Sequence, residues 1–444
     1  MKKVLVLGAG RSSSALIDYL LDHAENENWQ VVVGDMSLEA ASKKVSSHPR
    51  GTAIQFNLAD TSGVVNHISS ADAVISLIPP HLHAAVAAHC VELGKHLLTA
   101  SYVTKEMQAL NDDAARRGVL LLNECGLDPG IDHMSAMQLI DRIKAEGGQL
   151  TSFESFTGGL IAPTTDPENP WRYKFTWNPR NVVMAGQGTA RFLDESKMKY
   201  ISYQQLFKRI TTVHIPTLGD FEGYANRDSL KYIDAYGLNH VDTMVRGTLR
   251  NAGFCGAWNI LVQLGCTEDG YAMDGVEHLT HRDFINSFLP VRATESVEEK
   301  VTELFDLKPD GHEMKCLRWS GFFDREPVGL SQGTPAQILE YILNKKWRLQ
   351  ANDHDMIVMW HRFKYKLDQR TKEVQASLHC IGQDGVHTAM AKTVGLPLAI
   401  AAKLLLQGKI KSRGVCIPTV REIYGPVLEE LGHLGIKLAE WELS

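Results

Sequence analysis

Short apolar runs recur along the first third of the chain, and patterns of helical period separate them. The first run is Val4–Leu7, and the pattern over Arg11–Leu21 predicts a helix after it. Val31–Gly34 and Thr52–Phe56 repeat the alternation. Such runs are rich in β-branched residues and apolar on both faces, which is typical of strands buried in a parallel sheet.

Three more runs extend the series, and the first of them ends at two prolines, which cannot continue a strand ladder. They are Asp72–Ile78, Lys95–Thr99 and Val119–Leu122. Six strands alternating with helices predict an α/β fold with an open parallel sheet. Ligands of such sheets bind beyond the carboxyl ends of the strands, so the segment after each strand is a candidate site.

The turn after the first strand carries a dinucleotide fingerprint. Gly8 permits a tight turn, and Gly10 permits close approach of the backbone to a pyrophosphate at the next helix N-terminus. Ser13 replaces the third glycine, and it is small enough for close packing. Asp35 ends the second strand, where a carboxylate accepts hydrogen bonds from the ribose hydroxyls. This context predicts a Rossmann-type domain; the alternative is a glycine turn that binds nothing.

Beyond about residue 150 the pattern changes. Ser152–Gly159 alternates and then breaks at its two glycines, which predicts a mixed α/β domain with an antiparallel sheet. Met356–Tyr365 and Val374–Gly382 predict two more strands, and residues 265–345 read as mostly helical. Leu396–Leu406 predicts a buried apolar helix with Pro397 in its first turn, too short to span a membrane.

Composition narrows the class of function. The chain has 444 residues, of which 44% are hydrophobic and 22% charged, and a net charge of −6, so we expect neither a nucleic-acid nor a membrane partner. Seven cysteines without paired spacing indicate reduced thiols, and the chain opens on a core strand, so we expect a cytoplasmic protein without a signal peptide. His81, His83 and His89 lack partners at metal-ligand spacing, so we predict no metal site.

Several motifs, in the same order, resemble the glutamate-forming saccharopine dehydrogenase family nearly end to end. They are Ser101-Tyr102-Val103, Gly126–His133, Asn226–Ser229, Arg246–Arg250 and Thr393–Pro397. The resemblance implies that saccharopine, NAD(P) and water interconvert with glutamate, 2-aminoadipate 6-semialdehyde and NAD(P)H. It also implies a homodimer and four parts: a dinucleotide domain (1–130), a mixed α/β substrate and dimer domain (131–265 and 346–390), a helical insertion (266–345) and a C-terminal segment returning to the dinucleotide domain (391–444).

Saccharopine carries three carboxylates, which arginine binds best because its fork pairs with both oxygens. By resemblance, Arg227 and Arg250 bind substrate, and Ser101, Tyr102, Asp128, Thr248 and Leu249 line the site. The alternative for each arginine is a structural salt bridge, since Asp228 is adjacent to one of them.

Asp128 and Tyr102 are the catalytic candidates. Asp128 would hold the primary ammonium or polarise a proton transfer, and its alternative role is to cap a helix near Ile131. Tyr102 would meet the substrate amine or carboxylate through its hydroxyl; the alternative is a core aromatic. Asp132 and His133 are weaker candidates. The proton-transfer residue and the direction of the reaction stay open.

The resemblance assigns the cofactor to residues that mostly follow strands. They are Gly8, Gly10, Arg11, Ser12, Ser13, Asp35, Met36, Asn57, Leu58, Ser76, Leu77, Ile78, Ala100, Ser101, Leu127, Asp128, Pro129 and Asn178. Fungal relatives that use NADP carry a basic residue near the second strand, whereas this chain has Asp35, so we expect NAD in preference to NADP. Arg11 is the opposing observation. The alternative functions are a related carboxylated-polyamine (carboxynorspermidine-type) reductase and a non-catalytic dinucleotide-binding sensor.

Overall fold

The computed structural model describes residues 1–443 and resolves the chain into two compact units. The first unit comprises Met1–Gln149, Leu367–Arg370 and Leu378–Glu440. The second comprises Leu150–Lys366, Thr371–Ser377 and the chain from Trp441 onward. The four-part division predicted by residue number stays a prediction.

A seven-stranded parallel sheet organises the first unit, in the order β15-β6-β5-β4-β1-β2-β3. Its strands are β1 (Lys2–Leu7), β2 (Trp29–Asp35), β3 (Gly51–Gln55), β4 (Ala73–Ser76), β5 (His96–Thr99), β6 (Leu120–Leu122) and β15 (Gly414–Cys416). The strand order reverses between β1 and β4, which is where doubly wound sheets bind their ligands. The predicted Rossmann-type α/β fold is confirmed.

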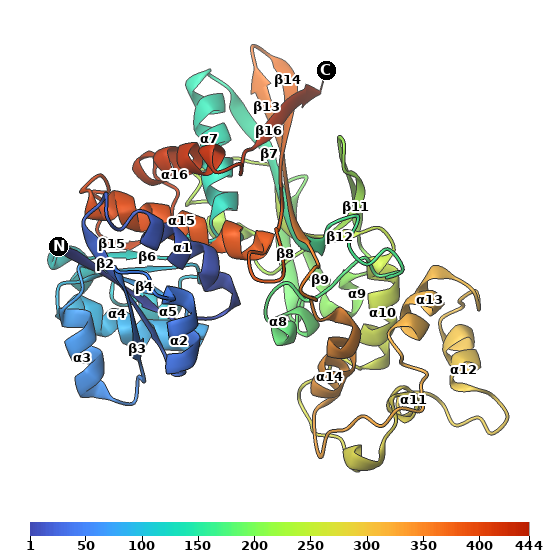
Figure 1. Ribbon diagram of the computed structural model, residues 1–444. Coiled ribbons are helices and arrows are strands. Elements are labelled where there is room, and N and C mark those ends of the chain that lie inside the picture. The colour runs from blue at the N-terminus through green and yellow to red at the C-terminus, as the bar shows by residue number, and fades with distance from the viewer. Residues whose placement is uncertain (444) are drawn as a thin grey trace. The chain divides into compact units, whose positions relative to one another are not determined.

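Helices cover both faces of this sheet (Figure 1). The helices of the first unit are α1 (Ser14–Asp22), α2 (Leu38–Val45), α3 (Thr61–Ser69), α4 (His83–Glu92), α5 (Lys105–Gln108), α6 (Asn111–Arg116), α7 (Ile131–Ala145), α15 (Ala389–Leu406) and α16 (Arg421–His433), of which α7 and α16 pack against each other. On one face α15 packs against α1 and α16. On the other face α3, α4 and α6 bury an apolar core that includes Val64, Val86 and Leu121.

Two predicted helix boundaries are wrong. Residues Arg11–Ser13 form a 3-10 turn, so α1 begins at Ser14. The last apolar helix begins at Ala389, which puts Pro397 in its interior. Thr388 caps this helix by accepting a hydrogen bond from the Ala391 amide, a start signal eight residues before the predicted helix. By length and hydropathy α15 qualifies as a membrane span, but 72% of that stretch is buried within the fold, as in many core helices.

The second unit is built on a sheet in the order β10-β11-β12-β7-β13-β14-β16, with β8 and β9 attached to β12. The strands are β7 (Gln149–Ile161), β8 (Thr189–Asp194), β9 (Lys197–Ser202), β10 (Thr211–Ile215), β11 (Gly219–Ala225), β12 (Thr243–Asn251), β13 (Asp355–Leu367), β14 (Arg370–Ile381) and β16 (Ala439–Leu443). The two strands predicted over Met356–Tyr365 and Val374–Gly382 are present as β13 and β14, which are neighbours in the sheet and form a hairpin. Its turn residues Asp368 and Gln369 have φ of 49° and 62°, typical of a type I′ turn.

The predicted antiparallel sheet is correct only in part, since β10, β11 and β12 pair antiparallel, and the predicted break at Gly158 is wrong. β12 runs parallel to β7, so the sheet is mixed. β7 continues through Gly158, where an added Cβ would lie 2.5 Å from the carbonyl oxygen of Leu249. The glycine therefore permits close strand contact instead of ending the strand.

The helices of the second unit are short except for two. They are α8 (Pro179–Val183), α9 (Tyr203–Leu206), α10 (Phe254–Leu264), α11 (His281–Asn286), α12 (Val297–Leu304), α13 (His312–Trp319) and α14 (Pro335–Trp347). Trp171, Trp258 and Trp347 pack together with ring centroids 5.2–6.3 Å apart and anchor the core.

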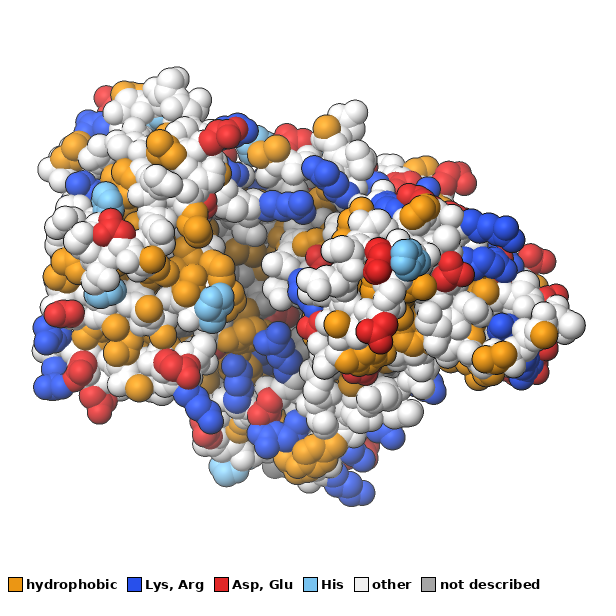
Figure 2. Space-filling model, turned by 90° about the horizontal axis from the view of Figure 1, so that it is seen from below, with side chains coloured by type: hydrophobic (Ala, Val, Ile, Leu, Met, Phe, Trp, Pro, Cys, Tyr) orange, Lys and Arg blue, Asp and Glu red, His pale blue; other side chains and the backbone are white. Residues whose placement is uncertain are grey.

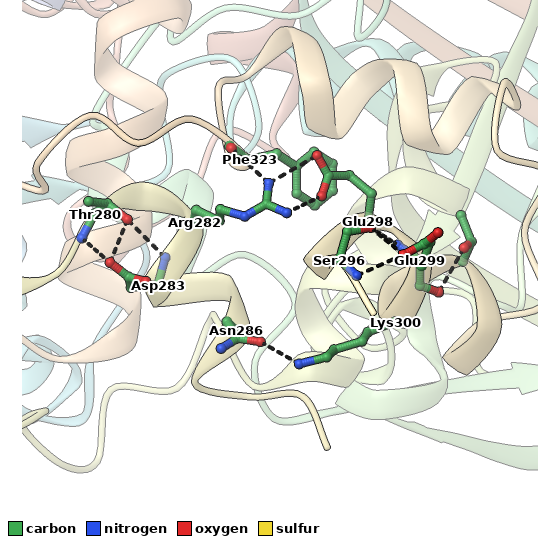
Figure 3. Close-up of polar contacts among 10 residues, drawn as sticks. Thr280, Arg282, Asp283, Asn286, Ser296, Glu298, Glu299, Lys300 and Phe323 are labelled. Atoms are coloured by element: carbon green, nitrogen blue, oxygen red, sulfur yellow. Dashed lines mark hydrogen bonds and ion pairs between the residues drawn. The ribbon is translucent and has the colours of Figure 1, made fainter. Parts of the chain in front are cut away.

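Polar contacts join α11 to α12 within residues 265–345, the stretch that the sequence predicts to be mostly helical (Figure 3). Arg282 of α11 points its guanidinium at the carboxylate of Glu298 on α12, with Nη1–Oε1 and Nη2–Oε2 distances of 3.0 and 2.6 Å. Ser296 and Glu299 form a capping box that starts α12. On the surface seen in Figure 2, acidic and basic side chains are interspersed over most of the face, in keeping with the modest net charge of −6.

Candidate functional site

The predicted cofactor residues of the first unit gather at one edge of its sheet. Gly8–Ser13, Asp35–Met36 and Asn57–Leu58 follow β1, β2 and β3. Ser76, Leu77 and Ile78 end and follow β4, Ala100 and Ser101 follow β5, and Leu127, Asp128 and Pro129 follow β6. Since all six strands are parallel, these segments share the carboxyl edge.

The glycine turn has the geometry that a pyrophosphate needs. Gly8 has φ of +105°, and an added Cβ would lie 2.9 Å from the backbone of Leu77, so only glycine fits. An added Cβ at Gly10 would meet no atom within 4 Å, so the backbone there faces open space. Ser13 is buried and donates its hydroxyl to the Gly10 carbonyl at 2.8 Å. Arg11 is exposed and Ser12 half-buried at the start of this turn.

Asp35 ties the glycine turn to the loop after β2. Its Oδ2 accepts the amide of Ala9 at 2.8 Å, and its Oδ1 accepts the amide of Ser37 at 2.9 Å. The nearest basic residues in the sequence are engaged elsewhere, since Lys43 pairs with Glu39 and Lys44 bonds the hydroxyl of Ser14. The carboxylate is thus fixed at the strand tip, with oxygen lone pairs that remain for hydroxyl donors.

Two other predicted cofactor residues on this edge are more exposed. Met36 is 72% exposed. Asn57 is also exposed, and its Oδ1 accepts the amide of Ala59 at 3.0 Å, whereas Leu58 packs against the core.

His83 is a residue of this edge that our sequence analysis considered only as a metal ligand. It is 3% exposed, its Nδ1 lies 2.8 Å from the Ser76 hydroxyl and its Nε2 lies 2.8 Å from the Ser101 hydroxyl. Burial lowers the pKa of its imidazole to about 4. The available signal was a histidine seven residues after a strand-end serine, which is too common to be noticed.

The loop after β6 places Asp128 half-buried, between the buried Leu127 and Pro129. The N-cap position of α7 is Gly130, two residues after Asp128, and both predicted roles of Asp128 stay predictions. The Gly130 amide donates a hydrogen bond to Asp132 Oδ1 at 2.6 Å. Tyr102 is also half-buried, one residue after Ser101.

In the second unit, Arg250 lies on β12 at 5% exposure. Its guanidinium carbon lies 5.1, 5.8 and 5.2 Å from the ring centroids of Tyr173, Tyr224 and Phe254. Nη1 donates to the Leu249 carbonyl at 3.0 Å, and Nε has no hydrogen-bond partner.

The strand neighbour of Arg250 does not neutralise it. Glu222 is opposite Arg250 in register, but its two oxygens accept the amides of Gly253 and Cys255 at 2.7 and 2.8 Å and so start α10. Within the described residues no carboxylate pairs with Arg250. The predicted alternative of a structural salt bridge is therefore absent there.

The remaining substrate candidates lie on or beside β12. Thr248 is half-buried opposite Tyr224, whereas Leu249 is fully buried. Arg227 is exposed with φ of 51°, and the adjacent Asp228 pairs with Arg191. Asn178 belongs to this second unit, where its side chain caps α8 by accepting the Asn181 amide.

Residues 1–443 contain no cluster of three or more histidine, cysteine or carboxylate side chains able to hold a metal ion.

Comparison with known proteins agrees with this arrangement. Residues 4–122 match the family model described as saccharopine dehydrogenase NADP binding domain, and residues 126–436 match saccharopine dehydrogenase C-terminal domain. The chain is similar to saccharopine dehydrogenase [NADP(+), L-glutamate-forming] of Schizosaccharomyces pombe, with 30% identity over 99% of both chains. Its structure is similar to apo saccharopine dehydrogenase (L-Glu forming) from Saccharomyces cerevisiae, with a TM-score of 0.90, 31% identity and full coverage of both chains.

A longer relative is matched only in part. The chain is 33% identical to alpha-aminoadipic semialdehyde synthase of Arabidopsis thaliana over 98% of its own length, but it spans only 44% of that protein. The two family models together with these full-length likenesses show that the chain belongs to the saccharopine dehydrogenase family.

Proposed function

We propose that the chain is a glutamate-forming saccharopine dehydrogenase, an NAD(P)-dependent oxidoreductase. It interconverts saccharopine, NAD(P)⁺ and water with glutamate, 2-aminoadipate 6-semialdehyde, NAD(P)H and a proton. The observation that carries this proposal is Arg250, a buried cation among aromatic rings without a carboxylate partner in the described residues. A buried arginine of this kind is completed by a carboxylate ligand, and saccharopine carries three carboxylates.

The residues of the first unit fit a dinucleotide. Open space at Gly10 and the start of α1 suit the pyrophosphate, and Asp35 suits a ribose. A bound nicotinamide would supply the acceptor for the hydride of the carbon beside the secondary amine. Asp128 holds the primary ammonium of the substrate or takes a proton, and the hydroxyls of Ser101 and Tyr102 orient the reacting groups.

We further propose NAD as the preferred cofactor. The carboxylate of Asp35 would repel the 2′-phosphate of NADP, and Lys43 and Lys44 are held by other groups. The fungal relatives are named for NADP(+), so this preference would set the chain apart from them.

Arg227, Thr248 and Leu249 complete the proposed substrate contacts, and Asn178 the proposed cofactor contacts. A homodimer in the cytoplasm stays a prediction.

The test is steady-state saccharopine oxidation with NAD and with NADP, followed by absorbance of the reduced dinucleotide. Turnover that releases glutamate supports the proposal. Dinucleotide binding without turnover of saccharopine would contradict the proposal and support the alternative of a non-catalytic sensor. Turnover only with a carboxylated polyamine would support the alternative of the related reductase.

A further inference from the structure

One imidazole joins two of the loops at the carboxyl edge of the parallel sheet. Ser76 is the last residue of β4, and Ser101 lies two residues beyond the end of β5. His83 lies between them, 2.8 Å from the hydroxyl oxygen of each. A third hydroxyl, that of Thr99, lies 3.4 Å from Nε2.

The ring must donate from one nitrogen and accept at the other, because burial keeps it neutral at neutral pH. Two hydroxyl oxygens face Nε2, while a single hydroxyl faces Nδ1. Thr99 Oγ1 already accepts the Ser101 amide at 3.3 Å. A hydrogen on Nε2 serves both oxygens at once, and Nδ1 then accepts the hydroxyl hydrogen of Ser76.

We propose that His83 is a positioning residue whose Nε2–H group turns the Ser101 hydroxyl, so that Ser101 presents its own hydrogen to an acceptor oxygen of the bound ligand. This inference rests on the proposed function, which places Ser101 beside substrate and cofactor. The acceptor is either a substrate carboxylate or the carboxamide oxygen of the nicotinamide, and both offer the same chemistry. With the opposite tautomer, Ser101 would donate to His83 and offer the ligand only lone pairs.

A double-mutant cycle tests whether His83 acts through Ser101. We expect His83→Ala and Ser101→Ala each to lower kcat/KM for saccharopine by about 10- to 100-fold, the usual effect of leaving a buried polar partner without its hydrogen bond. The double variant should be no slower than Ser101→Ala. Losses that multiply in the double variant would overturn the proposal.

Two further variants separate positioning from a general role in folding. Glutamine places an amide N–H near the position of Nε2, so His83→Gln should recover part of the activity lost in His83→Ala. The matched control is His96→Gln, because His96 begins β5 at the opposite edge of the sheet and accepts the Leu120 amide at 3.0 Å. It should lose stability but keep kcat/KM, and equal losses of activity in both would contradict positioning.

Binding measurements identify the acceptor. If Ser101→Ala raises the KM for saccharopine and leaves the Kd for NADH, measured by fluorescence, unchanged, the Ser101 hydrogen is assigned to a substrate carboxylate. A raised Kd for NADH assigns it to the carboxamide.

The tautomer can be read without any turnover. In protein labelled with ¹⁵N-histidine, the side-chain signals of His83, assigned by their loss in His83→Gln, should show hydrogen on Nε2 and none on Nδ1. A hydrogen on Nδ1 overturns the positioning role even if saccharopine is turned over. The expected tautomer in a protein that does not oxidise saccharopine would instead contradict only the proposed function.

Discussion

The Nε2 atom of His133 lies 2.9 Å from a carboxylate oxygen of Glu124, and both side chains are buried. The other oxygen of Glu124 accepts the amide of Val103 at 3.0 Å. Glu124 therefore connects the loop after β5, through Val103, to the beginning of α7, through His133. Glu124 and His133 flank the loop that carries Asp128 in the sequence. Its geometry makes it a structural support of the proposed site.

Replacing Glu124 by glutamine should destabilise the protein. The change puts an amide in place of a buried carboxylate that lies 2.9 Å from His133 Nε2 and accepts the Val103 amide. Losing a hydrogen bond to a charged group typically costs about 1.5–3 kcal/mol in the free energy of unfolding. Urea denaturation measures the loss. Glu39→Gln, in an exposed pair with Lys43, is the control and should leave the free energy of unfolding nearly unchanged. Similar effects of the two substitutions would show that the buried pair contributes nothing special.

Stability should fall as the solution is acidified from pH 6.5 to 4. The unfolded chain protonates His83 near its ordinary pKa of 6.5, whereas the folded protein holds that pKa at about 4, so protons favour unfolding in this window. Neutral burial of His83 contributes about 3 kcal/mol to this dependence. Thermal or urea unfolding across the window measures it. The slope should be smaller in His83→Gln than in the wild type, and an unchanged slope would contradict the assignment.

Asp35 should decide between the two dinucleotides. We expect kcat/KM for NAD to exceed that for NADP by about 100-fold, because like charges at an interface cost several kcal/mol. Asp35→Ala should narrow the gap by removing the repulsion. A wild-type enzyme that uses NADP equally well would refute the preference, and Arg11 would then be the residue to test.

Arg250→Ala should remove a bidentate carboxylate contact in a buried place. The expected loss is about 2–5 kcal/mol in transition-state binding, seen as a fall in kcat/KM for saccharopine with little change in the Kd for NADH. Arg292→Ala, which removes an exposed arginine paired with Glu295, is the control. If Arg250→Ala retains wild-type kcat/KM, Arg250 binds no substrate.

Asp128→Asn keeps the size of the side chain and removes its charge. Turnover of saccharopine should fall while the Tm stays nearly constant, because the cap position of α7 is Gly130. A lower Tm with normal turnover would instead make Asp128 a structural residue.

Six of the seven strands of the parallel sheet were predictable because each is a local apolar run with a turn beside it, whereas β15, with only three residues, was not predicted. The glycine turn and Asp35 were predictable for the same reason, since the fingerprint lies within one strand–helix–strand unit. Strand direction in the second unit was not predictable, because β7 and β12 are about 90 residues apart and their pairing depends on the whole chain. Gly158 was misread because its contact, the backbone of Leu249, lies on the partner strand.

The polar contacts of the candidate site were even harder to predict from the sequence. The partners of His83 come from two strand ends, and Arg250 lacks a partner only because Glu222 is committed to the start of α10. Neither fact can be obtained from spacing in the sequence.

The last strand of the parallel sheet, β15, pairs with β6 although about 290 residues separate them in the chain. During translation the first six strands are therefore synthesised long before α15 and β15. Of these later elements, α15 covers one face of the parallel sheet and β15 forms one of its edges. Until then the growing chain exposes apolar surface and an open strand edge, both of which favour association with other chains. Assembly of the nucleotide-binding unit is consequently delayed until synthesis has passed β15, by which time all of β7 to β14 has already been made.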